Sequence, residues 1–223
     1  MPPARRRIGL LGGTFDPPHI GHLALARSAR DALALQEVRF LPTGQSWQKP
    51  SGRTPAAQRL AMVTCALEGL DPAEGLRVDD REVRRSGPSY TVDTLGELRA
   101  ELGEHPALVL IIGSDQLHNL ASWHRWQDLF RFAHVAVTQR ERVPLTGLPE
   151  PVQQALEARG REALPDAPAG SIVFFRMPAV PVSATVLRDH LARGEAVSGL
   201  TPPAVLDYIA AHSLYAAQPP SFP

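Results

Sequence analysis

Apolar stretches with the length of a β-strand alternate along the chain with stretches whose apolar residues recur at helical spacing. The apolar run at Leu108–Ile112 is unbroken, as in a parallel strand that is covered on both faces. The pattern predicts strands at Arg7–Leu11, Val38–Leu41, Leu108–Ile112, His134–Thr138 and Ile172–Phe175, with a further extended segment at Leu76–Val78. It predicts helices at His19–Leu35, Ala56–Glu68, Thr91–Leu102, Trp123–Phe130, Val152–Arg159, Ala184–Arg193 and Pro202–His212.

Strands that alternate with helices in this way form a parallel sheet covered on both faces. We therefore expect an α/β fold, a doubly wound Rossmann-like parallel sheet with helices on both faces, formed by residues 1–223 as a single domain. The ends, 1–6 and 216–223, should be loosely held. Val143–Gly170, rich in proline, alanine and charge, is predicted to be a long surface excursion. Right-handed crossovers would gather the loops after the strands at one rim, where ligands usually bind.

The composition narrows the class of partner. Lysine plus arginine and aspartate plus glutamate both number 23, so no large single-sign field points to nucleic acid or to a membrane surface. No run approaches the ~20 apolar residues of a membrane span, and the short apolar run after Met1 does not make a signal peptide. The single cysteine, Cys65, lies in a helical pattern and suits a core position better than a nucleophile. We expect a cytoplasmic protein with small-molecule partners.

The first predicted strand runs into a turn that suits phosphate. Two glycines let backbone amides approach a ligand, and the next helix presents its free N–H groups there. Two histidines at i and i+3 share one face of its first turn, where their imidazoles can donate to anionic oxygens. The spacing fits neither the dinucleotide fingerprint nor a P-loop. Two histidines that cap and pack, or a zinc site that lacks its third ligand, are the alternatives. The segment reads Gly12-Gly13-Thr14-Phe15-Asp16-Pro17-Pro18-His19-Ile20-Gly21-His22.

A second polar motif, Ser183-Ala-Thr185-Val-Leu-Arg188, opens the helix predicted at Ala184–Arg193. Ser183 should be its N-cap, so that hydroxyls, helix-end amides and a guanidinium converge on a polyphosphate. Ordinary capping with a solvated arginine is the alternative. Gly194 should end this helix, and Thr201-Pro202 should supply the cap and first turn of the last one.

The glycine turn with its His-x-Gly-His element resembles the signature of the nucleotidylyltransferase superfamily. The Ser-x-Thr-x-x-Arg motif is similar to that of its small-molecule adenylyltransferases, whereas the Lys-Met-Ser-Lys-Ser loop of class I aminoacyl-tRNA synthetases is missing from the sequence. Four further blocks resemble, in order and spacing, the bacterial nicotinate-nucleotide adenylyltransferases. They are Ser89-Tyr90-Thr91-Val-Asp-Thr-Leu95, Ile111-Ile-Gly113-Ser-Asp115, Ala121-Ser-Trp123-His124 and Ala133-His134-Val-Ala-Val137.

This resemblance implies that AMP passes from ATP to nicotinate mononucleotide, giving deamido-NAD and pyrophosphate. Asp115 would then hold a ribose hydroxyl and Trp123 would stack on the pyridine ring, while backbone around Tyr90, Thr91 and His124 would receive the nicotinate carboxylate. Mg²⁺ would bridge the phosphates of ATP, with no metal site made by the protein alone. The ATP site would be formed by Gly12, Gly13, Thr14, Phe15, His19, His22, Ser183, Thr185 and Arg188.

A phosphate monoester is already a nucleophile at neutral pH, so the reaction needs positioning and charge neutralisation rather than a side-chain base. His19 and His22 would serve the α- and β-phosphates, and Lys49 and Arg188 the outer charge. Many relatives have Pro-Pro-His-Lys in the loop after the second strand, whereas this chain has Thr43-Gly-Gln-Ser-Trp47-Gln-Lys49-Pro50, so the neighbouring histidine is absent. Trp47 could shield the site or stack on a base.

Three other functions can be compared with this one on the same residues. The acceptor could be another phosphate compound, such as nicotinamide mononucleotide or pantetheine phosphate, although a pantetheine arm would not need Trp123, Tyr90 and Thr91. A silent nucleotide sensor would be expected to have lost a motif residue, and none is missing. A nicotinamide-dependent oxidoreductase lacks the required glycine spacing. The sequence leaves the oligomeric state open, a homo-oligomer included.

Overall fold

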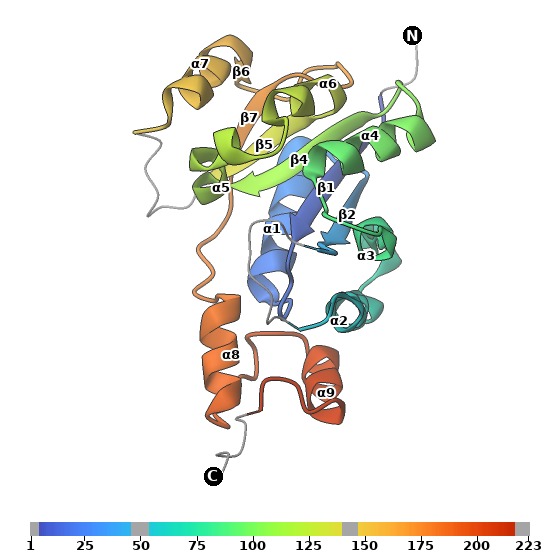
Figure 1. Cartoon of the computed structure of the whole chain (residues 1–223), viewed down its shortest axis with the longest axis vertical. Coiled ribbons are helices and arrows are strands. Elements are labelled where there is room, and N and C mark those ends of the chain that lie inside the picture. The colour runs from blue at the N-terminus through green and yellow to red at the C-terminus, as the bar shows by residue number, and fades with distance from the viewer. Residues whose placement is uncertain (1–4, 46–53, 140–146, 217–223) are drawn as a thin grey trace.

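The protein folds around a parallel β-sheet. The structure is a computed structural model and describes residues 5–45, 54–139 and 147–216. Within them the sheet has seven strands in the order β3-β2-β1-β4-β5-β7-β6, and helices lie on both sides of it (Figure 1). The predicted α/β class is therefore confirmed. The strands are β1 (Arg7–Gly13), β2 (Glu37–Pro42), β3 (Leu76–Val78), β4 (Ala107–Gly113), β5 (His134–Gln139), β6 (Gly160–Arg161) and β7 (Ile172–Arg176).

The helices follow the strands along the chain. The α-helices are α1 (Ile20–Leu33), α2 (Ala56–Glu68), α3 (Arg81–Arg84), α4 (Thr91–Leu102), α5 (Ser114–His118), α6 (Leu129–Phe132), α7 (Glu150–Arg159), α8 (Ala184–Ala192) and α9 (Pro203–Ala211). Short 3₁₀ turns lie at Pro72–Glu74, Leu120–Ser122 and Trp126–Asp128.

Each face of the sheet carries its own hydrophobic core, because successive side chains of a strand point to opposite faces. In β4, Leu108, Leu110 and Ile112 pack on the side of α4, α5, α6 and α7. Val109 and Ile111 pack on the opposite side, against α1. Every residue of β4 is buried, which explains why its sequence is apolar without interruption.

Two sequence predictions about the middle of the chain need correction. The helix expected at Trp123–Phe130 does not form as one element: Trp123 has an extended backbone and Arg125 has a φ of 48°, so a 3₁₀ turn and α6 follow separately. The described part of Val143–Gly170 does not simply cross the surface. It contributes α7 and the edge strand β6, and Val152 and Leu164 are buried in the two cores. The helix predicted at Val152–Arg159 is confirmed as α7. Periodicity cannot show β6 or the single turns after Trp123, because elements of two to four residues have no repeat.

The last two helices form a layer beyond the sheet, next to α2 (Figure 1). Val205 and Ile209 of α9 pack on Met62 and Ala66 of α2 in a core of their own. Pro202 rather than Thr201 precedes the first turn of α9 as its N-cap. The Thr201 hydroxyl instead donates to the carbonyl of Pro18 at 2.7 Å, so it ties this layer to the turn after β1.

The predicted ends of α8 agree with the structure. Ser183 is its N-cap, with a side-chain oxygen that accepts from the Val186 N–H at 3.3 Å. Gly194 follows its last turn with a φ of 68°, a conformation that favours glycine. Of the chain ends expected to be loose, 1–4 and 217–223 lie outside the described residues. Arg6 is held by an ion pair with Glu37 at 2.7 Å.

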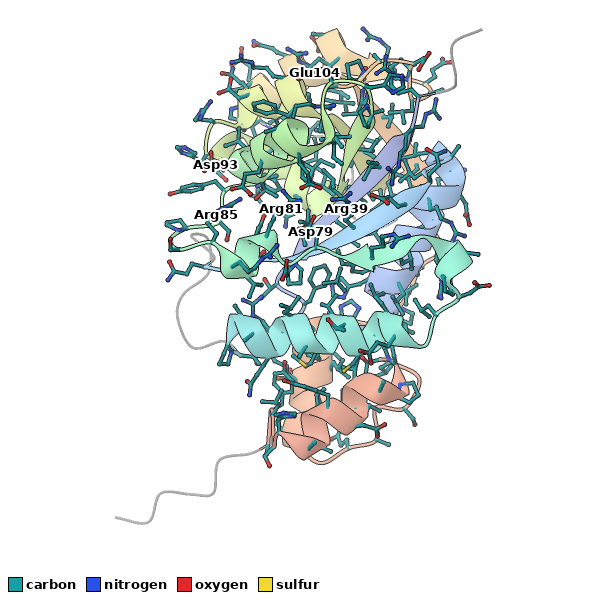
Figure 2. The ribbon with its side chains drawn as sticks, turned by 90° about the vertical axis from the view of Figure 1, so that its right-hand side faces the viewer. Arg39, Asp79, Arg81, Arg85, Asp93 and Glu104 are labelled. Atoms are coloured by element: carbon teal, nitrogen blue, oxygen red, sulfur yellow. The ribbon has the colours of Figure 1, made fainter. Side chains whose placement is uncertain are left out.

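An ion-pair network fixes α3 between the sheet and α4. Arg39 of β2 and Arg81 of α3 both contact the carboxylate of Asp79, at 3.3 and 2.8 Å, and the three side chains lie together in Figure 2. Arg81 also reaches Glu101 of α4 at 2.8 Å. Burial alone would raise the pKa of Asp79, but hydrogen bonds and the charge of Arg81 lower it overall. The carboxylate therefore stays ionised and anchors the segment that leads to Tyr90 and Thr91.

Candidate active site

A cleft of about 410 Å³ opens at the carboxyl ends of β1 and β4. These neighbouring strands lie where the strand order reverses, which is the usual ligand position in an open parallel sheet. The cleft brings together both polar motifs and the residues expected to bind the mononucleotide. Of the predicted site residues, its walls contain Gly12, Gly13, Thr14, Phe15, His22, Thr91, Asp115, Trp123, His124, Thr185 and Arg188.

The glycine turn forms the floor of the cleft. Space is open around Gly12, where an added Cβ would meet no atom within 4 Å. A Cβ on Gly13 would lie 3.0 Å from the ring of Phe15, so this position needs a small residue. Phe15 has a φ of 49° and is 2% exposed, and its ring packs against Phe40 and the edge of His22. Its aromatic ring therefore supports the turn from beneath.

The two histidines are stacked, with ring centroids 3.7 Å apart. His19 is the N-cap of α1 and His22 is the third helical residue, so both belong to the helix start. The Nδ1 of His22 accepts a hydrogen bond from the backbone N–H of His19 at 3.2 Å. In a neutral imidazole this leaves the proton on Nε2, which makes His22 a donor. His22 lines the cleft, while His19 is 8% exposed and lies against its partner ring.

Gly21 permits this close arrangement. A Cβ at Gly21 would lie 3.0 Å from the Nδ1 of His19 and 3.2 Å from a methyl group of Val182. A side chain here would push away both the first histidine and the segment that leads into α8. The glycine of the His-x-Gly-His element therefore lets two distant parts of the chain meet.

Arg188 joins the second motif to the first. Its Nη1 donates to the backbone carbonyl of Asp16 at 2.7 Å, although 172 residues separate the two positions. Its Nη2 lies 3.4 Å from the hydroxyl of Thr185, one turn earlier on α8. Ser183 acts as the cap of this helix and does not line the cleft. Of the groups predicted to face one another across the gap, His22, Thr185 and Arg188 line the same cleft, whereas His19 and Ser183 do not.

The opposite end of the cleft contains two buried polar atoms with no hydrogen-bond partner among the described residues. They are a carboxylate oxygen, Oδ1 of Asp115, and the indole nitrogen, Nε1 of Trp123. Such atoms are costly to bury unless a ligand satisfies them. Tyr90 does not line the cleft, but its ring lies 4.3 Å from that of His124, which does. This end can therefore bind a ligand that offers a hydrogen-bond donor to Asp115 and an acceptor to Trp123.

Several cleft residues were not predicted from the sequence. Glu82 and Thr94 line the wall, and the Thr94 hydroxyl donates to the Glu82 carboxylate at 2.8 Å. Burial raises the pKa of Glu82. Ser89 also lines the cleft, with an oxygen that has no hydrogen-bond partner in the described chain. Ser89 adjoins the predicted Tyr90-Thr91 pair, and Thr94 follows Thr91 at i+3, so helical spacing could have pointed to it.

Sequence reasoning also misses Arg59, which lies in the first turn of α2 and is 5% exposed. Its guanidinium donates to the carbonyls of Thr14, Thr43 and Gly44 at 2.7, 2.5 and 3.1 Å, and its Nε donates to Thr54 at 2.9 Å. It therefore fixes the turn after β1 against the loop after β2. Nothing in the sequence distinguishes it from an arginine on a solvated helix face.

Two residues of the loop after β2, Trp47 and Lys49, lie outside the described residues, so their predicted roles stay untested. Across the described ranges, no three side chains of histidine, cysteine, aspartate or glutamate gather as a metal site. In the same ranges, no helix has both the length and the apolarity that crossing a membrane requires.

Comparison with known proteins identifies the family. The cytidylyltransferase-like family model matches residues 10–190. A protein of Pseudomonas entomophila, named "Probable nicotinate-nucleotide adenylyltransferase", is 45% identical over 96% of this chain and 97% of its own length. One of Laribacter hongkongensis with the same name is 46% identical, over 97% and 98%. The chain belongs to the nicotinate-nucleotide adenylyltransferases of the cytidylyltransferase-like family.

The fold agrees with that of solved members of the family. The nicotinic acid mononucleotide adenylyltransferase of Plasmodium falciparum, in complex with NaAD, superimposes with a TM-score of 0.73. The alignment covers 95% of this chain and 98% of that one, at 18% identity. The part matched by the family model includes both the glycine turn and Arg188, whereas α9 and Tyr215 lie beyond it.

Proposed function

We propose that this enzyme transfers AMP from ATP to the phosphate of nicotinate mononucleotide, forming deamido-NAD and releasing pyrophosphate. The observation that carries the proposal is the meeting of the two phosphate motifs in one cleft, through the 2.7 Å contact of Arg188 with Asp16. The names of the relatives support the same reaction. The Plasmodium enzyme was solved with NaAD and also with APC, in line with nucleotides in such a cleft.

The triphosphate is assigned to the end of the cleft with His22, Thr185 and Arg188. A protonated Nε2, a hydroxyl and a guanidinium are all donors, and donors match anionic phosphoryl oxygens. The amides of Gly12 and Gly13 lie at the same end and leave room for close approach. His19 would act on the phosphates through the ring of His22, on which its own ring is stacked. Lys49 is assigned to the outer charge on the strength of the family resemblance.

The mononucleotide is assigned to the end with Asp115 and Trp123. The Asp115 Oδ1, which lacks a partner among the described residues, would accept from a ribose hydroxyl. Trp123 would stack on the pyridine ring. The backbone near Thr91 and His124 would receive the carboxylate, with Tyr90 holding His124 by ring packing. Backbone donors pair with a carboxylate but meet a clash at the NH₂ group of the amide, so the acid nucleotide should be preferred.

The chemistry requires no side-chain base. The acceptor phosphate attacks the α-phosphorus in line, and pyrophosphate leaves toward the donors of α1 and α8. His22 would donate to oxygens on which charge grows in the transition state, and Arg188 would bind the departing phosphates. Mg²⁺ prefers oxygen ligands, whereas this end offers mainly nitrogen donors, so the ion is assigned to the phosphates of ATP. It would neutralise the triphosphate there.

The test is pyrophosphate release with ATP and one acceptor at a time: nicotinate mononucleotide, nicotinamide mononucleotide and pantetheine phosphate. We expect release with the first and a much lower kcat/KM with the others. Equal rates with the acid and the amide would refute the backbone argument. A higher rate with pantetheine phosphate would replace the acceptor, and no release with any of them would refute the function.

A further inference from the structure

The chain turns back sharply after its last helix. Ser213 and Tyr215 have φ values of 50° and 61°, a region that residues other than glycine rarely adopt. The N–H of Leu214 donates to the carbonyl of Ile209 at 3.0 Å, which closes the turn on the end of α9. Because Ser213 and Tyr215 both have this unfavourable backbone, contacts with other parts of the chain must hold the turn in place. Those contacts lie at the glycine turn.

The hydroxyl of Tyr215 donates to the carboxylate Oδ1 of Asp16 at 2.6 Å. The hydroxyl oxygen of Tyr215 also lies 3.8 Å from the sulfur of Met62 on α2. Burial, together with the bond to the Asp16 carboxylate, raises the pKa of Tyr215. The phenol therefore remains a donor at any physiological pH. Asp16 itself is 3% exposed and lines the cleft, so the contact lies directly behind the ATP end.

Asp16 connects this tyrosine with the ATP motif. Its carboxylate accepts from Tyr215, and its backbone carbonyl accepts from Arg188 at 2.7 Å. The bond to the carboxylate holds the side chain and the Cα of Asp16 in place, which limits the positions that the carbonyl of the same residue can adopt. Removal of the phenol would loosen Asp16 and, with it, the acceptor that orients the guanidinium.

The rest of the turn has separate supports. Thr201 donates to the Pro18 carbonyl at 2.7 Å, and the Ile20 N–H donates to the carbonyl of Leu200 at 3.0 Å. These bonds do not involve Tyr215 or Asp16. Loss of one hydroxyl should therefore change the aim of Arg188 without unfolding the turn.

We propose that Tyr215 is a positioning residue for adenylyl transfer: through the Asp16 carboxylate it fixes the carbonyl that orients Arg188 toward ATP. The inference rests on the proposed function, in which Arg188 binds the phosphates of ATP. It extends the site to a C-terminal residue that the family model does not reach.

The test compares Tyr215→Phe with Tyr208→Phe in the full chain. Tyr208 belongs to the same core, and no hydrogen bond of its hydroxyl is found in the described chain, so it is the matched control. Because Arg188 loses the fixed acceptor that aims it at ATP, kcat/KM for ATP should fall roughly tenfold or more in Tyr215→Phe. The KM for the mononucleotide should stay unchanged, and the Tm should fall only modestly, because the buried Asp16 carboxylate loses one donor. Tyr208→Phe should behave as wild type in both activity and Tm.

A double-variant cycle decides whether the effect passes through Arg188. In an Arg188→Ala background, adding Tyr215→Phe should cause no further loss of kcat/KM for ATP. If the losses of kcat/KM in the two single variants multiplied in the double variant, the proposal would be overturned. It would also be overturned if the wild type were active and Tyr215→Phe had the same kcat/KM for ATP. If the wild type released no pyrophosphate at all, the proposed function would fail first. The Kd for ATP, measured by calorimetry on wild type and Tyr215→Phe, would then test the positioning role alone: an unchanged Kd would overturn it.

Discussion

Replacement of Asp115 by alanine should separate binding from stability. The Oδ1 of Asp115 is buried without a partner among the described residues, while its other oxygen accepts a bond from the Gln116 amide at 3.2 Å. A protein that buries such an atom loses stability in the free state and recovers it when a ligand donates to it. The variant should therefore weaken mononucleotide binding with little or no cost to folding.

The favourable and unfavourable effects of Asp115→Ala on the free energy of unfolding nearly cancel. Removal of an unsatisfied buried oxygen relieves about 1–3 kcal/mol. Against this, the variant loses the favourable charge of Asp115 in the first turn of α5, about 0.3–1 kcal/mol, and the bond from Gln116, about 0.5–1.5 kcal/mol. At the middle of these ranges the free energy of unfolding changes by less than about 1 kcal/mol, and their extremes run from about 1.5 kcal/mol lost to about 2 kcal/mol gained.

The magnitude for binding is larger. A ribose hydroxyl that donates to a carboxylate contributes about 1.5–3 kcal/mol, so the KM for nicotinate mononucleotide should rise roughly 10- to 100-fold. The KM for ATP should stay within a few-fold of wild type. Steady-state pyrophosphate release and urea denaturation measure the two effects. Asp93→Ala is the matched control, because Asp93 is an exposed acid in the first turn of α4.

The reasoning would be refuted if Asp115→Ala lost more than about 2 kcal/mol of stability, outside the range of the terms above, while the KM for the mononucleotide stayed unchanged. That result would make Asp115 a structural residue of α5. If the KM values for ATP and for the mononucleotide rose together, Asp115 would maintain the shape of the cleft instead of binding the ribose.

Four further predictions address other parts of the molecule. His22→Ala should lower kcat on the order of 10²–10³-fold in a pyrophosphate-release assay, and a loss of only a few-fold would contradict its role. Trp123→Ala should raise the KM for the mononucleotide, since stacking on one base contributes about 1–3 kcal/mol, and Trp123→Phe should restore most of the affinity. Burial, the largest influence, lowers the pKa of His134, so the neutral imidazole stabilises the fold fully at a pH above the ordinary pKa of 6.5, and this stability is lost as the pH falls below that value. The Tm measured from pH 8 to 5 should show the loss, and His134→Gln should make the Tm less dependent on pH. Arg59→Met should cost about 3 kcal/mol or more in urea unfolding and raise the KM for ATP, because buried carbonyls lose their donor; Arg59→Lys should recover only part, since an ammonium lacks the planar fork.

The sequence predicts the long elements well and the short ones poorly. β4 is found to within a residue at each end, because a strand buried on both faces must be apolar throughout. The helices α3 and α5 have four and five residues, too few for a periodic pattern to appear. The sequence predicts one helix at Trp123–Phe130, whereas the left-handed backbone at Arg125 breaks this stretch into separate turns.

For the candidate site, contiguous motifs could be predicted and dispersed partners could not. The glycine turn with His22 is a local signal, since one strand, one turn and one helix end create the phosphate position. Glu82 and Arg59 reach the same cleft region from other elements, and their roles depend on which carbonyl or hydroxyl the fold places opposite them. Asp16 belongs to the glycine-turn motif, yet its contacts with Arg188 and Tyr215 come from the far end of the chain.

The way α8 is attached explains why these polar contacts matter. Leu187 is the one buried residue on α8, so apolar packing contributes little to its orientation. The neighbouring helix α9 supplies most of the apolar contact, through Val205 and Ile209 against α2. Apolar burial sets how strongly this layer is held, but it is non-directional. Hydrogen bonds are directional, so the contact of Arg188 with Asp16 can fix the angle at which α8 presents its motif to the cleft.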